Sequence, residues 1–295
     1  MLIRWFIFFI LALAVSEVFF RYALGLGDPP LYKRDAAYEY ALSPNQNLKR
    51  FGNQFSTNDF GMRSSNINPE QDEILLLVGD SVVNGGALLD QSETISTIIE
   101  QRFSTLYKDR EVRVASISAG SWGPQNQIAF LEQLPELNII GAALVFSSHD
   151  NSDIPTFRYS DTLVPQSRPV LALEEVVRKY LPALLGRVIK FIKKGEESTT
   201  IRKSHKNGGE VRKIVSFLER YNVPMFIYHH LTLQEVLSES LEFNDVYTSD
   251  VRYFDHQASE VSDSSLYYID NIHPSPLGAK LMGEQIFKDF AKVLP

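Results

Sequence analysis

The sequence predicts an α/β protein: a three-layer α/β/α sandwich with a mainly parallel central sheet, preceded by an N-terminal hydrophobic helix. From Glu73 onward, short apolar runs alternate with stretches whose apolar residues recur at helical spacing. The run Ile74–Val78 is continuously apolar, which is typical of a strand buried on both faces. Strands that alternate with helices favour a parallel sheet covered on both sides. We therefore expect one α/β domain over residues 73–295.

The expected elements of this domain follow in chain order. The strands are Ile74–Val78, Val112–Ile117, Ile139–Ser147 and Pro224–Tyr228. The helices are Thr94–Phe103, Gln125–Leu134, Leu173–Lys194, Glu210–Tyr221 and Pro276–Val293. Pro182 is expected to kink the third of these helices. Ligands of such sheets sit at the carboxyl ends of the strands, which is where reactive side chains are to be sought.

Composition excludes several classes of function. The 295 residues carry a net charge of −7, which argues against nucleic acid as the main partner because that partner usually requires a basic face. The sequence contains no Cys, so disulfides, thiolate metal sites and cysteine nucleophiles are excluded. None of the six His stands at metal-ligand spacing with a carboxylate as third partner. We expect no metal and no other cofactor.

Residues 1–24 form a hydrophobic N-terminal segment that indicates export. Trp5–Val15 is an uninterrupted run of 11 apolar residues behind Arg4. That length matches the core of a signal peptide, about 7–15 residues, better than a full span of about 20. Ala12-Leu13-Ala14 offers a cleavage site. One interpretation is therefore a cleaved signal peptide.

The other interpretation, which we favour, is a signal anchor. Counting on to Leu24 gives a helix long enough to remain in the membrane if Glu17 and Arg21, at i and i+4, pair near the interface. Residues 5–24 would then hold the protein in the inner or cytoplasmic membrane. Both interpretations place the rest of the chain outside the cytoplasm, in the periplasm or at the cell surface.

An extended lead-in is expected over residues 25–72. Gly25, Gly27, Pro29 and Pro30 stop any helix at its start. The remainder is polar and aromatic without a sustained period, so we expect it to wrap around the domain. Asn58–Arg63 is expected to form a tight turn inside this lead-in.

A candidate nucleophile follows the first strand of the domain. In Gly79-Asp80-Ser81, the serine would sit at a helix N-terminus, where backbone amides favour developing negative charge. Val83 stands where the G-x-S-x-G motif needs its last glycine, so an α/β-hydrolase elbow is disfavoured. The alternative is that this tripeptide merely caps a helix.

Two further segments strengthen the hypothesis of nucleophilic catalysis. Asp270 precedes His273 by three residues, so the carboxylate can accept from one ring nitrogen while the other takes a proton from Ser81. The alternative for this pair is a helix N-cap with a surface histidine. Gly120 follows the second strand, and its amide can approach an oxyanion because no side chain intervenes.

This order of blocks resembles the SGNH (GDSL-like) hydrolase superfamily over roughly residues 73–290. Gly79-Asp80-Ser81, Gly120 and Asp270-Asn271-Ile272-His273 match its first, glycine and last blocks. The resemblance implies a flavodoxin-like fold and a triad of Ser81, His273 as base and Asp270 as its orienting acid. It also implies an oxyanion hole that includes the amides of Ser81 and Gly120. The lead-in segments Gly25–Tyr32 and Asn58–Arg63 look like those of membrane-tethered bacterial members linked to envelope or exopolysaccharide modification.

One block departs from this pattern. Where the family has Gly-x-Asn-Asp, this chain reads Ser147-Ser148-His149-Asp150, so His149 takes the place of the asparagine that donates to the oxyanion. An imidazole N–H can also donate, and we expect His149 to complete the oxyanion hole. Asn151 can fill the role if the loop is shifted by two residues. Asn151 and His230 are also candidates for the substrate pocket, with a structural role equally open for His230.

The function that these residues and the resemblance imply is that of an exported serine esterase, which hydrolyses O-acyl esters through an acyl-enzyme on Ser81. The expected substrate is an O-acetyl group on an envelope or secreted carbohydrate. Two alternatives stay open: a polysaccharide O-acetyltransferase that uses the same site, and a non-catalytic glycan-binding or assembly module. Acyl length, glycan identity and oligomeric state are beyond the sequence.

Overall fold

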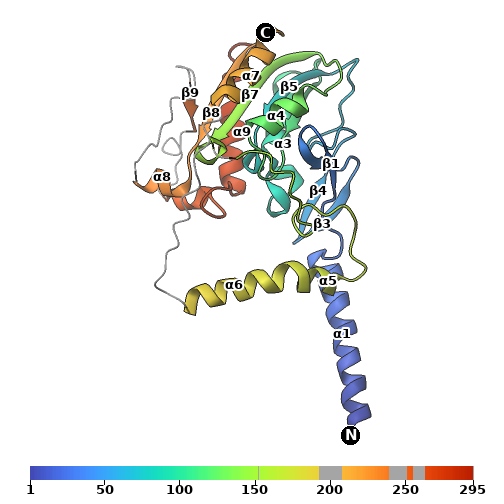
Figure 1. The fold of residues 1–295 in the computed structure, drawn as a ribbon. Helices are drawn as coiled ribbons and strands as arrows, with labels where there is room; N and C mark the ends of the chain where they lie inside the picture. Colours follow the sequence, from blue (N-terminus) through green and yellow to red (C-terminus); the bar gives the residue numbers. More distant parts are fainter. Residues whose placement is uncertain (152, 193–207, 239–250, 255–262, 295) are drawn as a thin grey trace.

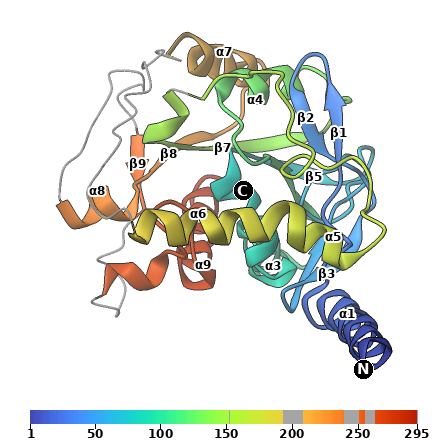
Figure 2. The ribbon, with the colours of Figure 1, turned by 60° about the horizontal axis from the view of Figure 1, so that its bottom comes forward.

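The structure is a computed structural model (Figure 1). It describes residues 1–151, 153–192, 208–238, 251–254 and 263–294, without the side chains of residues 151, 187–192 and 208. Within these residues a central sheet is covered by helices on both faces, which confirms the predicted α/β/α class (Figures 1 and 2).

The central sheet has five strands among the described residues. In spatial order they are β6 (Val112–Ile117), β5 (Glu73–Val78), β7 (Ile139–Ser147), β8 (Met225–His230) and β9 (Val251–Tyr253). Every neighbouring pair in this sheet is parallel. Numbered along the chain, the order is 2-1-3-4-5, the flavodoxin-like order in which ligands bind at the carboxyl edge beside the first strand.

Strand β5 is buried on both faces, as its continuous apolar run predicts. Its residues Ile74, Leu76 and Val78 join one hydrophobic core, and Leu75 and Leu77 join the other. Helices α4 (Pro124–Leu131) and α7 (Gly208–Glu219) cover the first core, and α3 (Ile95–Leu106) and α9 (Pro276–Phe290) cover the second. All four helices were expected within a few residues of these bounds.

The edge of the sheet differs from the prediction. Strand β9 was not expected, because a run of three residues at an edge leaves no recognisable period in the sequence. Strand β8 runs two residues past its predicted end, so His229 and His230 lie in the strand rather than after it. A short helix, α8 (Leu233–Ser238), follows β8.

The long amphipathic segment is one continuous helical stretch with a local irregularity. It comprises α5 (Ala172–Glu175), a π-helical turn (Val176–Tyr180) and α6 (Leu181–Ile192). The irregularity lies in the turn before Pro182 rather than at that residue. This position follows from proline chemistry, because Pro182 has no N–H to donate and its ring crowds the carbonyl one turn earlier.

The lead-in is more regular than the extended segment that we expected. It forms two antiparallel hairpins, β1 (Tyr32–Asp35) with β2 (Glu39–Leu42) and β3 (Asn47–Arg50) with β4 (Asn53–Ser56). The second hairpin turns through Phe51 and Gly52, which both have positive φ, as a two-residue type I′ turn requires. Phenylalanine is an unusual first residue for that turn, so the sequence carried no recognisable hairpin signal.

The lead-in packs against the loops at the carboxyl edge of the sheet. Buried Arg63 donates to the backbone carbonyls of Asn84, Gly86 and Leu89 in the segment that follows Ser81. Burial lowers the pKa of Arg63 to about 10, so the guanidinium stays charged at neutral pH. The lead-in therefore supports the site from outside the α/β domain.

Helix α1 (Leu2–Leu24) projects from the domain, and none of its residues is buried (Figure 1). It is long and apolar enough to cross a membrane, a test that a signal sequence also passes. The predicted pair of Glu17 and Arg21 is confirmed, with 2.7 Å between Arg21 Nη2 and Glu17 Oε1. The same carboxylate accepts hydrogen bonds from the backbone N–H groups of Ala172 and Leu173, which ties α1 to the start of α5.

We predict that Arg63→Met lowers the free energy of unfolding of the full chain by about 3 kcal/mol, because it leaves several buried carbonyls without their donor. Urea unfolding in detergent followed by tryptophan fluorescence measures the change. Exposed Arg158 lies in the same wild-type chain, and Arg158→Met is the control, expected to stay within about 0.5 kcal/mol. Equal stability of the two variants would contradict a supporting role for Arg63.

Candidate active site

Ser81 sits where the central strand β5 turns into α2 (Ser81–Asn84). Asp80 is the N-cap of this helix, and its Oδ1 accepts a hydrogen bond from the N–H of Val82 at 2.8 Å. Gly79 permits the tight turn, because a Cβ there would lie 2.4 Å from a methyl group of Val83. The capping interpretation of Gly-Asp-Ser is therefore correct for Asp80, and it coexists with a serine placed at the start of a helix.

Asp270, His273 and Ser81 form a continuous chain of hydrogen bonds. His273 Nδ1 lies 2.8 Å from Asp270 Oδ2, and His273 Nε2 lies 3.0 Å from Ser81 Oγ. The carboxylate accepts from Nδ1–H, so Nε2 is left as the acceptor of the serine O–H. The structure thus brings together three residues that the sequence separates by up to 192 positions.

The Asp270 carboxylate also holds its own loop in shape. Its Oδ1 accepts from the backbone N–H groups of Ile272 and His273, both at 2.8 Å. Burial raises the pKa of Asp270, but these bonds and the His273 side chain outweigh burial, and the pKa lies below its ordinary value. The carboxylate is therefore ionised at neutral pH, as an orienting partner of a histidine base must be.

His230 supports this loop from behind. Its imidazole is 1 % exposed, and Nε2 donates to the carbonyl of Ile272 at 2.7 Å. The Tyr268 hydroxyl adds a second link to the same strand end, donating to the carbonyl of Leu231 at 2.6 Å. The buried ring thus bonds the backbone of the loop that carries Asp270 and His273, and the expected place of His230 in the substrate pocket stays a prediction.

Gly120 lies in the loop after β6, at the same edge of the sheet as Ser81. Its carbonyl accepts from the Tyr40 hydroxyl at 2.6 Å, and the Tyr40 carbonyl accepts from the Trp122 indole at 2.8 Å. A cavity of about 560 Å³ opens beside it, with Glu39, Arg158 and Ser160 in its lining. Tyr40 thus fixes the orientation of a glycine peptide that faces a polar cavity.

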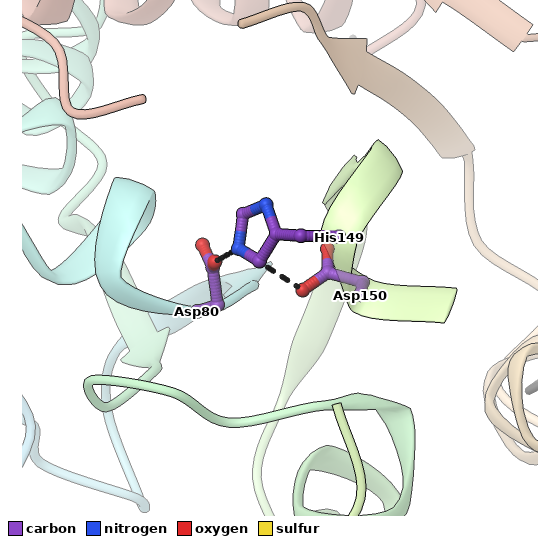
Figure 3. Close-up of side chains that lie close together, drawn as sticks. All are labelled: Asp80, His149 and Asp150. Carbon is purple, nitrogen blue, oxygen red and sulfur yellow. Dashed lines mark hydrogen bonds and ion pairs between the residues drawn. The ribbon is translucent and has the colours of Figure 1, made fainter. Parts of the chain in front are cut away.

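His149 lies after β7 and is bonded to the residue that precedes the candidate nucleophile (Figure 3). Its Nε2 is 2.7 Å from Asp80 Oδ2 and 3.8 Å from Asp150 Oδ1. Both carboxylates are buried, and Asp150 Oδ2 accepts a hydrogen bond from the N–H of Ser147 at 2.7 Å. His149 is therefore part of an ion pair in which both carboxylates are buried and the imidazole is partly exposed.

The surroundings of this cluster shift the pKa of His149 and the pKa of Asp150. Burial lowers the pKa of His149, but the hydrogen bond to Asp80 and the charges of Asp150 and Asp80 outweigh it and raise the pKa to about 9. Burial and the nearby Asp80 raise the pKa of Asp150 well above its ordinary value. His149 is thus an imidazolium at neutral pH, and an imidazolium carries N–H groups on both nitrogens.

The same cluster is the group of described residues in which metal-ligand atoms converge. One atom each from Asp80, His149 and Asp150 lies within 4.8 Å of the others. The 2.7 Å between His149 Nε2 and Asp80 Oδ2 is the length of a charge-assisted hydrogen bond. We therefore interpret the cluster as an ion pair that shares a proton, and we derive no step through a metal.

A second cluster of serine, histidine and carboxylate lies nearby but has a different order. Ser148 Oγ donates to the Glu235 carboxylate and lies 3.3 Å from His229 Nε2. Because the carboxylate accepts from the serine instead of the histidine, this arrangement does not activate the hydroxyl. The side chain of Asn151 lies outside the described residues, so its expected role stays a prediction.

Several residues of the site were not found from the sequence. Tyr40 and Arg63 come from the lead-in, which has no periodicity that would link it to the sheet edge. The contact between Asp80 and His149 was not predicted, because the two residues lie 69 positions apart in the sequence. Asp150 had a local signal, because it directly follows His149 at the end of a predicted strand.

The raised pKa of His149 predicts a pH-dependent stability. An unfolded histidine has a pKa near 6.5 and the folded one about 9, so the stabilisation by this ion pair is complete below about pH 6.5 and is lost as the pH rises through 9. We expect His149→Asn to be less stable than wild type at pH 6, with the difference narrowing towards pH 9.5.

Urea midpoints of the full chain across this pH range measure the difference. His229→Asn is the matched control, because burial lowers the pKa of that histidine and its variant should show no such narrowing. A difference for His149→Asn that stays constant with pH would contradict the imidazolium.

Comparisons with known proteins found similar solved structures only. No protein-family model matches the sequence, and no curated protein matches it. A protein from Slackia heliotrinireducens assigned to the SGNH hydrolases is 11% identical, with 75% of this chain and 100% of that chain covered and a TM-score of 0.38. The acetylxylan esterase Axe2 from Geobacillus stearothermophilus is 14% identical, with coverages of 74% and 94% and a TM-score of 0.32. LAE5, an alpha/beta hydrolase enzyme from the metagenome of Lake Arreo, is 12% identical, with coverages of 76% and 98% and a TM-score of 0.33. These likenesses leave the activity of this chain to be argued from its own site.

Proposed function

We propose that this protein is a membrane-anchored serine esterase of SGNH type. The observation that carries the proposal is the hydrogen-bonded chain from Asp270 through His273 to Ser81, with the serine at the start of a helix. In this arrangement the serine hydroxyl donates to a histidine, and an ionised carboxylate orients that histidine. Such a chain of hydrogen bonds activates serine for attack on a carbonyl.

The reaction has two halves. Ser81 Oγ attacks the ester carbonyl carbon as its proton moves to His273 Nε2. The tetrahedral intermediate collapses, the bond to the alcohol oxygen breaks, and His273 returns the proton to that oxygen. Water then attacks the acyl-enzyme and gives its proton to His273. The second tetrahedral intermediate collapses, the bond to Ser81 Oγ breaks, and His273 returns the proton to this oxygen as the acid leaves.

Three groups are proposed to stabilise the oxyanion. They are the backbone N–H groups of Ser81 and Gly120 and the imidazolium of His149. A charged donor suits this role, because charge-assisted hydrogen bonds are stronger than neutral ones. One oxyanion donor typically contributes about 10²–10³ in turnover. The hydrogen bond from His149 to Asp80 holds the ring beside the residue that precedes the nucleophile.

The proposed substrate is an O-acetyl ester on an envelope or secreted carbohydrate. Family resemblance suggests this class, and two features of the site are compatible with it. The side chains of Asp270 and His273 are exposed enough for a polymer to approach. The cavity beside Gly120 is lined by charged and hydroxyl side chains and also by apolar ones, Ile154, Leu163 and Val164, which suits a ligand with hydroxyl groups and acyl groups.

Export and anchoring are proposed from α1. Arg4 precedes the apolar run, and positive residues favour the cytoplasmic side of the membrane. The last turns of α1 are bonded to the domain through Glu17 and Arg21. A helix that is part of the folded junction is better explained as a retained anchor than as a cleaved signal peptide.

A fluorophosphonate probe tests the nucleophile. We expect stoichiometric labelling at Ser81 in the full chain, none in Ser81→Ala, and labelling slowed at least about 10³-fold in His273→Ala because the base is lost. Ser148→Ala is the matched control and should label normally, since Ser148 contacts a histidine and a carboxylate in the wrong order. A folded wild type that is not labelled would favour a non-catalytic glycan-binding module.

Product analysis then separates hydrolysis from transfer. With an acetylated oligosaccharide as donor and a deacetylated one as acceptor, an esterase releases free acetate in an amount equal to the donor consumed. Acetylated acceptor in place of acetate would identify the O-acetyltransferase instead. In both cases Ser81→Ala should abolish consumption of the donor, because both reactions require the same acyl-enzyme.

A further inference from the structure

Helix α6 carries an exposed apolar stripe. Leu181, Leu184 and Leu185 are 42 %, 58 % and 52 % exposed, and Val177 in the preceding π turn is 57 % exposed. In the sequence, Val188, Ile189 and Ile192 continue the same helical spacing. Among the described residues, the only element that packs extensively against α6 is that π turn. An apolar stripe of this size on a helix that projects from its domain indicates a binding surface.

The charged residues of the π turn and α6 are all basic, whereas α5 before them carries Glu174 and Glu175. Between residues 176 and 192 the sequence has Arg178, Lys179, Arg187 and Lys190 and no acidic residue. An apolar stripe flanked by lysine and arginine is typical of a helix that lies in the interface of an anionic bilayer. A partner protein would not require this one-sided charge, whereas anionic headgroups are attracted to it.

Helix α6 starts beside the domain end of α1 and runs in a different direction. In Figure 1, α1 runs away from the domain and α6 runs sideways from the same junction. Figure 2 shows α1 nearly end-on and α6 from its side, so the two helices are steeply inclined to each other. If α1 crosses a bilayer, α6 extends along its surface.

The junction between α1 and α6 is held by buried polar contacts. Arg50 Nη2 lies 2.6 Å from Glu175 Oε1, and both side chains are buried. Glu175 also accepts from the N–H of Gly27 at 2.7 Å, just after α1. At the other side of the junction, Arg21 in α1 donates to the carbonyl of Val170 at 2.8 Å. The direction of α6 relative to α1 is therefore set by the fold.

We propose that α6 lies on the extracytoplasmic surface of the bilayer that α1 spans, with Leu181, Leu184 and Leu185 at the boundary of headgroups and acyl chains. This inference rests on the anchoring proposed above.

Single cysteines test the depth of α6, because the natural chain contains none. The full chain with Leu184→Cys, labelled with the fluorophore NBD, is reconstituted into vesicles of phosphatidylglycerol and phosphatidylcholine that contain nitroxide-labelled lipid. We expect blue-shifted emission and about two-fold or stronger quenching, since such helices bury their apolar face roughly 5–10 Å deep.

Two matched positions serve as controls. Ala183→Cys lies on the opposite side of the same exposed helix and should be weakly quenched. Leu106→Cys, at an equally exposed leucine at the end of α3, should be quenched no more than Ala183→Cys. Equal quenching at positions 183 and 184 would overturn the proposal. A blue shift at position 184 without quenching by the nitroxide lipid would also overturn it, and would indicate a protein partner or a second copy of this chain.

A third position separates failure of this inference from failure of the anchor. Leu11→Cys lies in the middle of α1 and should be strongly quenched if α1 spans the bilayer. Strong quenching at position 11 without quenching at 184 would leave the anchor in place and refute the surface helix. No quenching at position 11 would refute the anchor itself. A urea transition like that of wild type shows that each labelled variant is folded.

Discussion

The parallel pairing of β5 with β6 on one side and β7 on the other is the constraint on which the site depends. Parallel strands end at the same edge, so the loops that follow these three strands meet there. Ser81, Gly120 and His149 each come from one of those loops. His273 lies in a fourth loop, the one before α9. Buried His230 in β8 bonds the backbone of that loop and so links it to the sheet. The sheet and the hydrogen bonds that support this loop thus bring Ser81, His273 and Asp270 together from distant parts of the chain.

Much of this arrangement could be predicted, and the failures have physical causes. β5 and β7 are continuous apolar runs that are easily recognised, and the motifs after β5 and β6 placed Ser81 and Gly120 at one edge. The pair Asp270 and His273 is local in sequence, which is why its spacing was informative. The hairpins of the lead-in were missed because each strand has four residues and one turn uses Phe51. Tyr40 and Arg63 were missed because a contact between a loop and a distant loop leaves no pattern in either segment.

His149 stands where the pattern that the sequence resembles has an asparagine, and it gives this part of the site a different electrostatic character. An amide is neutral at every pH, whereas the imidazole here is charged because Asp80 and Asp150 are buried against it. Buried carboxylates are costly unless they are paired, so the three residues form a unit in which loss of the histidine would leave uncompensated charge. His149 is therefore accommodated by its neighbours: Asp80 caps the helix that begins at Ser81 and also bonds the ring of His149.

The polar junction at the end of α1 has a kinetic consequence. The helix is bonded directly to the domain by the side chains of Glu17, Arg21, Arg50 and Glu175. An anchored domain would therefore not rotate independently of α1. It would diffuse in two dimensions at a constant height and with a constant tilt. Its encounters would then depend on the number of esters per unit area within that thin layer, and not on their concentration in the surrounding volume.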